Sequence, residues 1–313
     1  MKEQNIKHSK NILNELSNKL DKYKSQLVKS EEAEIKHHIS TAIIEKLLKV
    51  FEELEKNEKD LHKQVSTLRY TLETLIITRL LIKEADYFLK MYYSLYEHQE
   101  NKRNIMIKRV ENELALLREY AMKYSHEKKN NKQLYSKDPQ TMNDENERVF
   151  QFYKKQIQEH INIYFDHLEE LGFESSLYLL ENEILKQYQN ELTEFKQVKI
   201  NRAKHLSKQE WFKKYFDVKK QHSKVFKSLK DVRSWEEKAE LVKLSNEYKL
   251  NYERTSSLLH FNSYSLFTSN EINQDEIDYN YQILNQYVSH IVKNINAFSR
   301  VMLYDIFNVI DVS

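Results

Sequence analysis

The chain of 313 residues contains one glycine, one proline and no cysteine. An average soluble protein has about 7% glycine and 5% proline, and strand-rich folds use these residues in the tight turns between strands. The composition therefore argues against a sandwich, a barrel or a doubly wound sheet. A phosphate-binding loop of the GxxxxGK[ST] or GxGxxG type cannot be built around Gly172 alone. The lack of cysteine excludes disulfides, thiolate metal ligands and a cysteine nucleophile.

The remaining composition favours helices. Charged residues make up 31% of the chain and hydrophobic residues 40%, and 21 tyrosines and 14 phenylalanines indicate a packed protein rather than a disordered one. We predict an all-α fold, a multi-helix bundle with long antiparallel helices. No apolar run approaches the roughly 18 residues that span a membrane, and the lysine-rich N-terminus lacks the apolar core of a signal peptide. We therefore expect a cytoplasmic protein without a membrane partner.

Apolar periodicity divides the chain into four expected parts. Residues 1–44 form an N-terminal helical or coiled-coil segment, 45–124 a first helical part, 125–147 a flexible linker or loop, and 148–313 a second helical part. An apolar seam with alternating steps of three and four residues runs from Leu47 to Leu75, and only Glu58 breaks it. The seam fits either packing within one bundle or a dimerising helical hairpin.

Several local signals predict where helices begin and end. Residues 125–147 lose the periodicity and contain the only proline, Pro139, which favours the linker. Gly172 fits a left-handed cap at the C-terminal end of a helix that begins near residue 147. Ser207 with Glu210, and Ser234 with Glu237, match the capping box and predict helices over about 208–230 and 235–260.

Positive charge is concentrated in one block although the whole chain carries only +2. Residues 196–233 contain 13 Lys or Arg against three acidic residues, and aromatic side chains such as Trp211 are interleaved with them. Cations can neutralise phosphates while aromatic rings stack on unpaired bases. The candidate nucleic-acid contacts are Trp211, Lys213, Lys214, Lys219, Lys220 and Lys224. The alternatives are an ordinary amphipathic helix pair with its aromatics in the core, or a surface for an acidic protein.

Two segments carry candidate site residues. Arg69 and Glu73 lie one turn apart on a strongly apolar helix, where a charged pair needs mutual pairing or a third partner. Farther along, Tyr252, Ser256 and His260 recur every four residues, and His260 has the side chain best suited to proton transfer near neutral pH. Either set also fits a purely structural role, as an internal ion pair or a helix-end histidine.

These residues carry two resemblances. The RxxxE helix and the later SxxxH-x-N segment, here Arg69, Glu73, Ser256, His260 and Asn262, resemble the marks of an uncharacterised bacterial family of helical proteins, over roughly residues 45–300. The spacing of Arg254 and His260 is similar to the Rx(4–6)H motif of HEPN-domain ribonucleases and toxins.

The HEPN resemblance implies a HEPN-like helical core that acts on RNA without metal, with Arg and His from two subunits lining a cleft. Arg254 would then stabilise the phosphate and His260 would transfer a proton. The residue after the arginine is usually Asn, Asp or His in that motif, and here it is Thr255, which leaves an inactive or purely binding relative open. The implied context is bacterial stress or anti-phage defence.

Other chemistries fit less well. A carboxylate-bridged di-metal bundle needs two Glu-x-x-His motifs, and the sequence offers only Glu34 with His37, so we expect no metal and no cofactor. The HEPN resemblance, together with the basic block, implies a protein that binds RNA or acts on it, with a homodimer or a partner protein as further expectations. The alternative is a non-catalytic interaction, adaptor or regulatory protein of a multi-component defence or toxin–antitoxin system.

Overall fold

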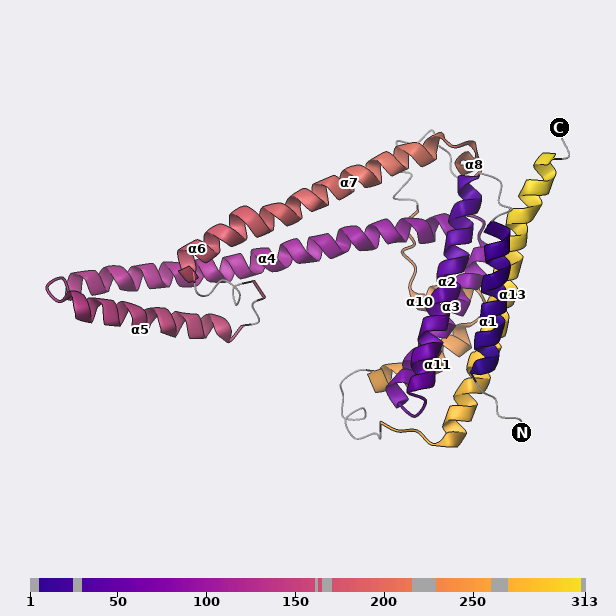
Figure 1. The fold of residues 1–313 in the computed structure, drawn as a ribbon, viewed down its shortest axis with the longest axis horizontal. Coiled ribbons are helices and arrows are strands. Elements are labelled where there is room, and N and C mark those ends of the chain that lie inside the picture. The colour runs from indigo at the N-terminus through magenta and orange to yellow at the C-terminus, as the bar shows by residue number, and fades with distance from the viewer. Residues whose placement is uncertain are drawn as a thin grey trace. The chain divides into compact units, whose positions relative to one another are not determined.

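The computed structural model describes residues 6–24, 30–160, 163–164, 171–215, 229–259 and 270–310. Its elements, shown in Figure 1, are α1 (Lys7–Lys24), α2 (Glu31–Lys56), α3 (Leu61–Lys83), α4 (Tyr87–Leu134), α5 (Pro139–Gln158), α6 (Gly172–Leu179), the π-helix η3 (Leu180–Ile184), α7 (Leu185–Lys208), α8 (Glu210–Lys213), α10 (Trp235–Leu241), α11 (Ser245–Leu259) and α13 (Gln274–Ile310). Within these ranges there is no strand beyond an isolated bridge between Asp60 and Glu271. The all-α prediction is confirmed. None of the helices described combines the length and the apolar character that crossing a membrane requires.

The chain divides into two compact units. Unit 1 contains Met1–Ser94 and Leu206–Ser313, and unit 2 contains Leu95–His205. This division differs from the expected boundaries at residues 44, 124 and 147, because the N-terminal and C-terminal parts of the chain share one core. Periodicity along a sequence identifies helices but does not reveal which distant helices pack together.

Helix α3 is the centre of unit 1. It packs against α2, α10, α11 and α13, and Figure 1 shows α1, α2, α3 and α13 running side by side. Its buried residues include Leu68, Leu72 and Ile76 as well as Thr71 and Thr78. A helix that is apolar on most of its faces is stable only inside a core. The sequence of α3 therefore determines that other helices surround it.

Buried threonines of α3 are compatible with this burial where the hydroxyl bonds to a carbonyl of the same helix. Thr71 Oγ1 donates to the Thr67 carbonyl at 2.7 Å, and Thr78 Oγ1 donates to the Leu75 carbonyl at 3.0 Å. Burial removes the water molecules to which a hydroxyl would otherwise bond, and these bonds to the helix replace them.

Helices α2 and α3 are separated near Glu58, the position that breaks the apolar seam of the sequence. Helix α2 ends at Lys56, and α3 begins after Asp60, whose side chain accepts a hydrogen bond from the Lys63 N–H at 2.9 Å. The seam residues Leu47 and Leu75 are buried in the core of unit 1, which is the arrangement that the one-bundle interpretation predicts.

The linker expected over residues 125–147 is wrong. Helix α4 continues to Leu134, and α5 begins at Pro139, so only a short turn separates them. Asp138 caps α5 by accepting from the Thr141 N–H at 3.2 Å. Proline is favourable at the first helical position, because its missing N–H would have no partner in the helix there. Pro139 therefore begins a helix where the sequence analysis had assumed a break.

Gly172 does not end the helix that precedes it. Helix α5 ends at Gln158, and Gly172 stands at the start of α6 with a φ of +74°. The left-handed backbone predicted for Gly172 is confirmed, but its predicted place at the C-terminal end of a helix is wrong. In unit 2 the next residue, Phe173, packs its ring against Tyr124 and Phe150, with centroids 5.5 and 5.0 Å away.

The two predicted capping boxes have different outcomes. The box at Ser234 and Glu237 is confirmed, since the Glu237 N–H donates to Ser234 Oγ at 3.2 Å and the Ser234 N–H donates to the Glu237 carboxylate at 2.6 Å. The box at Ser207 is wrong: Ser207 is buried within α7, and Gln209 precedes α8 without a side-chain cap.

The helices predicted over 208–230 and 235–260 are both shorter than expected. Helix α8 covers only Glu210–Lys213, and residues 216–228 lie outside the described part of the chain. The second stretch is divided into α10 and α11 by a turn in which Lys243 has a φ of 58°. A left-handed residue after a helix ends it, and the position is usually filled by glycine.

An ion-pair network joins the end of α3 to the segment before α10. Arg233 binds the Glu84 carboxylate through Nη1 and through Nη2 at 3.1 Å, and it binds Asp231 through Nε at 2.7 Å and Nη2 at 3.1 Å. Lys90 contacts Glu84 at 3.1 Å, and Lys238 contacts Asp231 at 3.3 Å. Burial raises the pKa of Glu84 and of Asp231, but the hydrogen bonds and charge of Arg233, together with Lys90 at Glu84 and Lys238 at Asp231, outweigh it and lower both.

We expect Arg233→Gln to lower the free energy of unfolding at pH 7 by about 1.5–3 kcal/mol, the usual range for hydrogen bonds to a charged group. Carboxyls with a lowered pKa stabilise the fold above their ordinary values of 4.5 and 3.8, and this stabilisation is lost as the pH falls through the folded values. The difference between wild type and variant should therefore shrink on acidification. Urea unfolding at pH 7 and pH 3.5 measures it.

Lys56→Gln is the control, since its pair with Glu53 leaves 68% and 55% of the two side chains exposed. Such a pair contributes about 0–1 kcal/mol. An Arg233→Gln variant as stable as Lys56→Gln at pH 7 would contradict the role given to the network.

Candidate functional site

Helices α3 and α11 bring the two candidate segments together. Arg69 Nε binds Glu73 Oε1 at 3.0 Å on α3, and the Arg69 guanidinium carbon lies 5.3 Å from the centre of the Tyr252 ring on α11. One turn earlier on α11, the Tyr248 ring stacks on Tyr252 with a centroid distance of 5.6 Å and an interplanar angle of 29°. Arg69, Glu73, Tyr248 and Tyr252 form what we call the α3–α11 face.

Solvent reaches the α3–α11 face. The side chains of Arg69 and Glu73 are 31% and 22% exposed, and Tyr252 is 41% exposed. Burial raises the pKa of Tyr248, the charge of Arg69 opposes that effect, and the charge of Glu73 adds to it. The face therefore combines an ion pair with two stacked phenol rings at a half-exposed position.

The remaining candidates on α11, Ser256 and Arg254, lie on different sides of the helix. Ser256 lies one turn after Tyr252, so it shares the direction of the α3–α11 face, and it is half-buried. Arg254 lies two residues after Tyr252, about 200° around the helix axis, and therefore does not belong to that face. Arg69, Glu73 and Tyr252 therefore lie together in the structure, and Arg254 lies on another side of α11.

Thr255 stands at the position where the chain departs from the Rx(4–6)H pattern. It is fully buried, and its Oγ1 donates to the Tyr252 carbonyl at 3.3 Å. The position where the motif usually has a polar residue therefore faces the core in this chain. His260 lies outside the described residues, as does Asn262, so the expected pairing of Arg254 with His260 stays a prediction.

The described aromatic residues of the basic block belong to the core of unit 1. Phe212 is 1% exposed, and Trp211 is partly buried with its ring 6.4 Å from Phe88. Tyr215 packs edge-on against Phe88 at 5.5 Å, and its hydroxyl donates to Glu32 Oε1 at 2.7 Å. These contacts correspond to the amphipathic alternative, in which the rings pack inside and the lysines face solvent.

The cations of the block are also partly neutralised. Lys199 pairs with Glu100 at 2.8 Å in unit 2, Lys213 pairs with Glu210, and Arg233 belongs to the network described above. Lys214 is exposed. The other proposed contacts, Lys219, Lys220 and Lys224, lie outside the described residues. The block is moreover divided between the two units, since unit 2 ends at His205.

The two residues of the Glu34-x-x-His37 motif on α2 lie in different environments. His37 is buried and its Nε2 lies 3.0 Å from the Leu20 carbonyl, whereas Glu34 is exposed. Across the described ranges, no group of three or more His, Asp or Glu side chains could hold a metal ion.

The sequence analysis missed the part that Tyr248 plays in the α3–α11 face. Its four-residue spacing from Tyr252 is the signal that could have identified the stacked pair, because side chains at i and i+4 are neighbours on a helix.

Comparison with models of protein families, with curated proteins and with solved structures found no match.

Proposed function

We propose that this chain is a HEPN-like protein that binds single-stranded RNA at the α3–α11 face and cleaves it by metal-independent acid–base chemistry. The observation that carries the proposal is the contact between Arg69 and Tyr252, which joins the two segments that the sequence singled out independently.

The chemistry of the α3–α11 face suits an unpaired nucleotide. Single-stranded RNA is held by aromatic rings on which bases stack and by cations that contact the backbone. Tyr252 offers a 41% exposed ring that is already supported by Tyr248. Arg69 lies directly beside that ring and offers a planar donor for a phosphate or a base edge.

Cleavage would require residues that follow on α11. A guanidinium can stabilise the charge that develops on a phosphate, and an imidazole can move the proton of the attacking or leaving oxygen. In our proposal Arg254 and His260 have these roles, and Ser256 and Glu73 position the substrate. Arg254 points away from the α3–α11 face, so a second copy of the chain would supply the opposing half of the cleft.

A second candidate is a non-catalytic interaction or regulatory protein. Two observations favour it: Thr255 is fully buried, and Glu73 already neutralises Arg69. In that case the charged pair serves to order α3 against α11, and the chain binds a partner without chemistry. The experiments below separate the two.

Tyr252→Ala should weaken the binding of a fluorescein-labelled single-stranded RNA by about 5- to 150-fold, since loss of one stacked base costs about 1–3 kcal/mol. Fluorescence anisotropy at fixed salt measures the dissociation constant. Tyr178→Ala is the matched control, because Tyr178 is 62% exposed and belongs to α6 of unit 2. Equal affinities of the two variants would refute the RNA-binding face.

Glu73→Gln should strengthen RNA binding, because it removes the carboxylate that neutralises Arg69. Each additional cation on the strand makes the slope of log K against log salt concentration steeper by about 0.7 for single strands. Salt titrations of wild type, Glu73→Gln and Arg69→Gln measure this slope. An unchanged slope in Glu73→Gln would show that Arg69 does not contact the backbone.

His260→Ala should abolish RNA cleavage measured in EDTA, while RNA binding is kept. Arg254→Ala should also reduce the cleavage rate, by removing the charge that stabilises the transition state. Gel analysis of an end-labelled RNA at high protein concentration measures both. Cleavage by wild type and His260→Ala at the same rate, or by neither, would exclude the nuclease and favour the non-catalytic candidate.

A further inference from the structure

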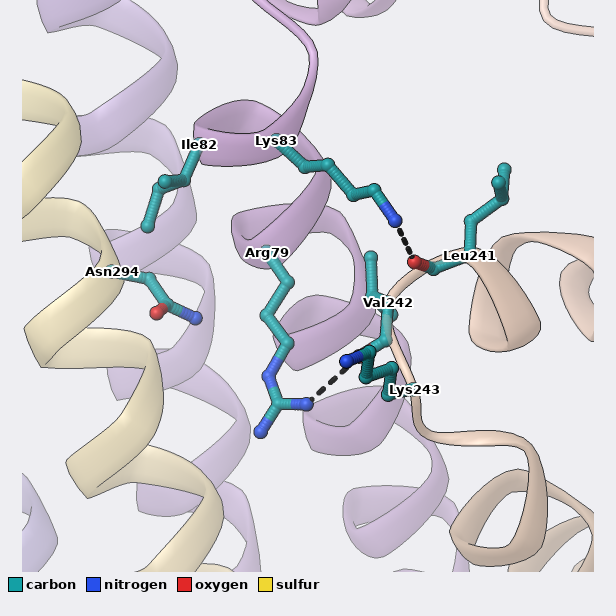
Figure 2. A pocket seen from close by; sticks show the side chains of 7 residues that line it. All are labelled: Arg79, Ile82, Lys83, Leu241, Val242, Lys243 and Asn294. Atoms are coloured by element: carbon teal, nitrogen blue, oxygen red, sulfur yellow. Dashed lines mark hydrogen bonds between the residues drawn. The ribbon is translucent and has the colours of Figure 1, made fainter.

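A second concave site lies on the C-terminal half of α3, away from the α3–α11 face. Figure 2 shows this pocket of about 280 Å³, which we call the α10 pocket. Its lining comes from three helices and the turn after α10, all within unit 1. The lining residues are Arg79, Ile82, Lys83, Leu241, Val242, Lys243 and Asn294.

Two cations of the α10 pocket are held by backbone carbonyls. Arg79 Nη1 donates to the Val242 carbonyl at 3.0 Å, and Lys83 Nζ donates to the Leu241 carbonyl, as the dashed lines in Figure 2 mark. A guanidinium has five N–H groups and an ammonium has three, and these bonds use one from each. Both side chains are thus oriented toward the turn after α10 and retain donors for a ligand.

The positive charge of the α10 pocket is not neutralised by the protein. Over the described part of the chain, no carboxylate pairs with Arg79, Lys83 or Lys243. Glu84, the acid next to Lys83 in sequence, is bound by Arg233 and Lys90 instead, and Glu240, three residues before Lys243, is exposed. Burial, Arg79 and Lys293 together lower the pKa of His290, which agrees with positive potential on this side of α3.

Lys243 adds a third cation from a backbone position that costs stability. Its φ of 58° is left-handed, and a side chain there costs about 1 kcal/mol relative to glycine. Two hydrogen bonds keep the turn in place: the Lys243 N–H donates to the Glu240 carbonyl at 3.0 Å, and the Leu244 N–H donates to the Ala239 carbonyl at 2.8 Å. Strained positions are concentrated at functional sites, and this one directs a lysine to the pocket.

The rest of the lining suits a small organic group. Ile82, Leu241 and Val242 supply an apolar wall. Asn294 supplies an amide whose orientation is fixed by its bond to Thr78 Oγ1 at 3.1 Å. Ligand sites combine apolar walls with a few fixed polar groups in this way.

We propose that the α10 pocket binds the terminal phosphate of a small phosphomonoester, with Arg79, Lys83 and Lys243 as its ligands. Three cations around one pocket match a dianion, and the guanidinium matches two of its oxygens. The apolar wall accepts the attached organic group. A pocket of this volume holds one small molecule rather than a strand of nucleic acid, and the proposal does not depend on RNA binding at the α3–α11 face.

Isothermal titration with AMP, with inorganic phosphate and with uncharged adenosine tests the proposal. Wild type should bind AMP and phosphate but not adenosine, and Lys243→Gly should weaken AMP binding by about tenfold or more. Glycine accepts the left-handed backbone, so this variant should fold at least as stably as wild type. Arg79→Gln should weaken binding similarly. Lys63→Gln, an exposed lysine at the start of α3, is the matched control and should bind like wild type.

The assignment would be overturned by no binding of AMP or phosphate by wild type, by equal binding by Lys243→Gly and Lys63→Gln, or by binding of adenosine as tight as that of AMP. Competition by an RNA oligonucleotide without a terminal phosphate, at the same affinity as AMP, would also overturn it. Loss of AMP binding in Lys243→Gly with RNA binding unchanged would establish that the two sites are independent.

Discussion

The burial of α3 on most of its faces is the constraint on which unit 1 depends. The buried faces of α3 carry leucines, isoleucines and threonines that bond within the helix, so α2, α10, α11 and α13 pack around it. Four charged side chains of α3 lie beside elements that pack on it. Arg69 and Glu73 meet α11 in this way, and Arg79 and Lys83 meet the turn after α10. The two candidate sites therefore result from one feature, a central apolar helix with a few charges.

The two pairs on α3 differ in what neutralises them. Arg69 has a carboxylate one turn away, so the α3–α11 face is close to neutral and its exposed aromatic ring is the main recognition element. Arg79 and Lys83 bond to carbonyl oxygens, which orient the cations without removing their charge. A neutral aromatic face suits a base, whereas a cationic pocket suits a phosphate dianion. The separation of Arg69 and Lys83, 14 residues or about 21 Å along a helix, keeps the two sites distinct.

Local rules predicted the features that depend on neighbouring residues. The helix break after Lys56, the capping box at Ser234 and the pairing of Arg69 with Glu73 all follow from spacings of three or four residues. Pro139 and Gly172 were misjudged because either residue can stand at the start or at the end of a helix, and only packing decides between the two. The α10 pocket could not be predicted, since Arg79 and Val242 are 163 residues apart and the bond between them has no local signature.

In the basic block, the described aromatic rings pack on the core instead of standing beside exposed cations. Trp211 and Tyr215 pack on Phe88 beside the buried pair of Glu32 and Lys36, whose Nζ and Oε1 atoms are 2.6 Å apart. The Tyr215 hydroxyl satisfies the same carboxylate, and Lys36 lies 4.8 Å from the centre of the Phe88 ring. A buried ion pair is stable only when such partners complete its hydrogen bonds. Trp211 and Tyr215 are therefore committed to packing against the core, whereas Tyr248 and Tyr252 form an aromatic pair that stands beside an arginine at a half-exposed position.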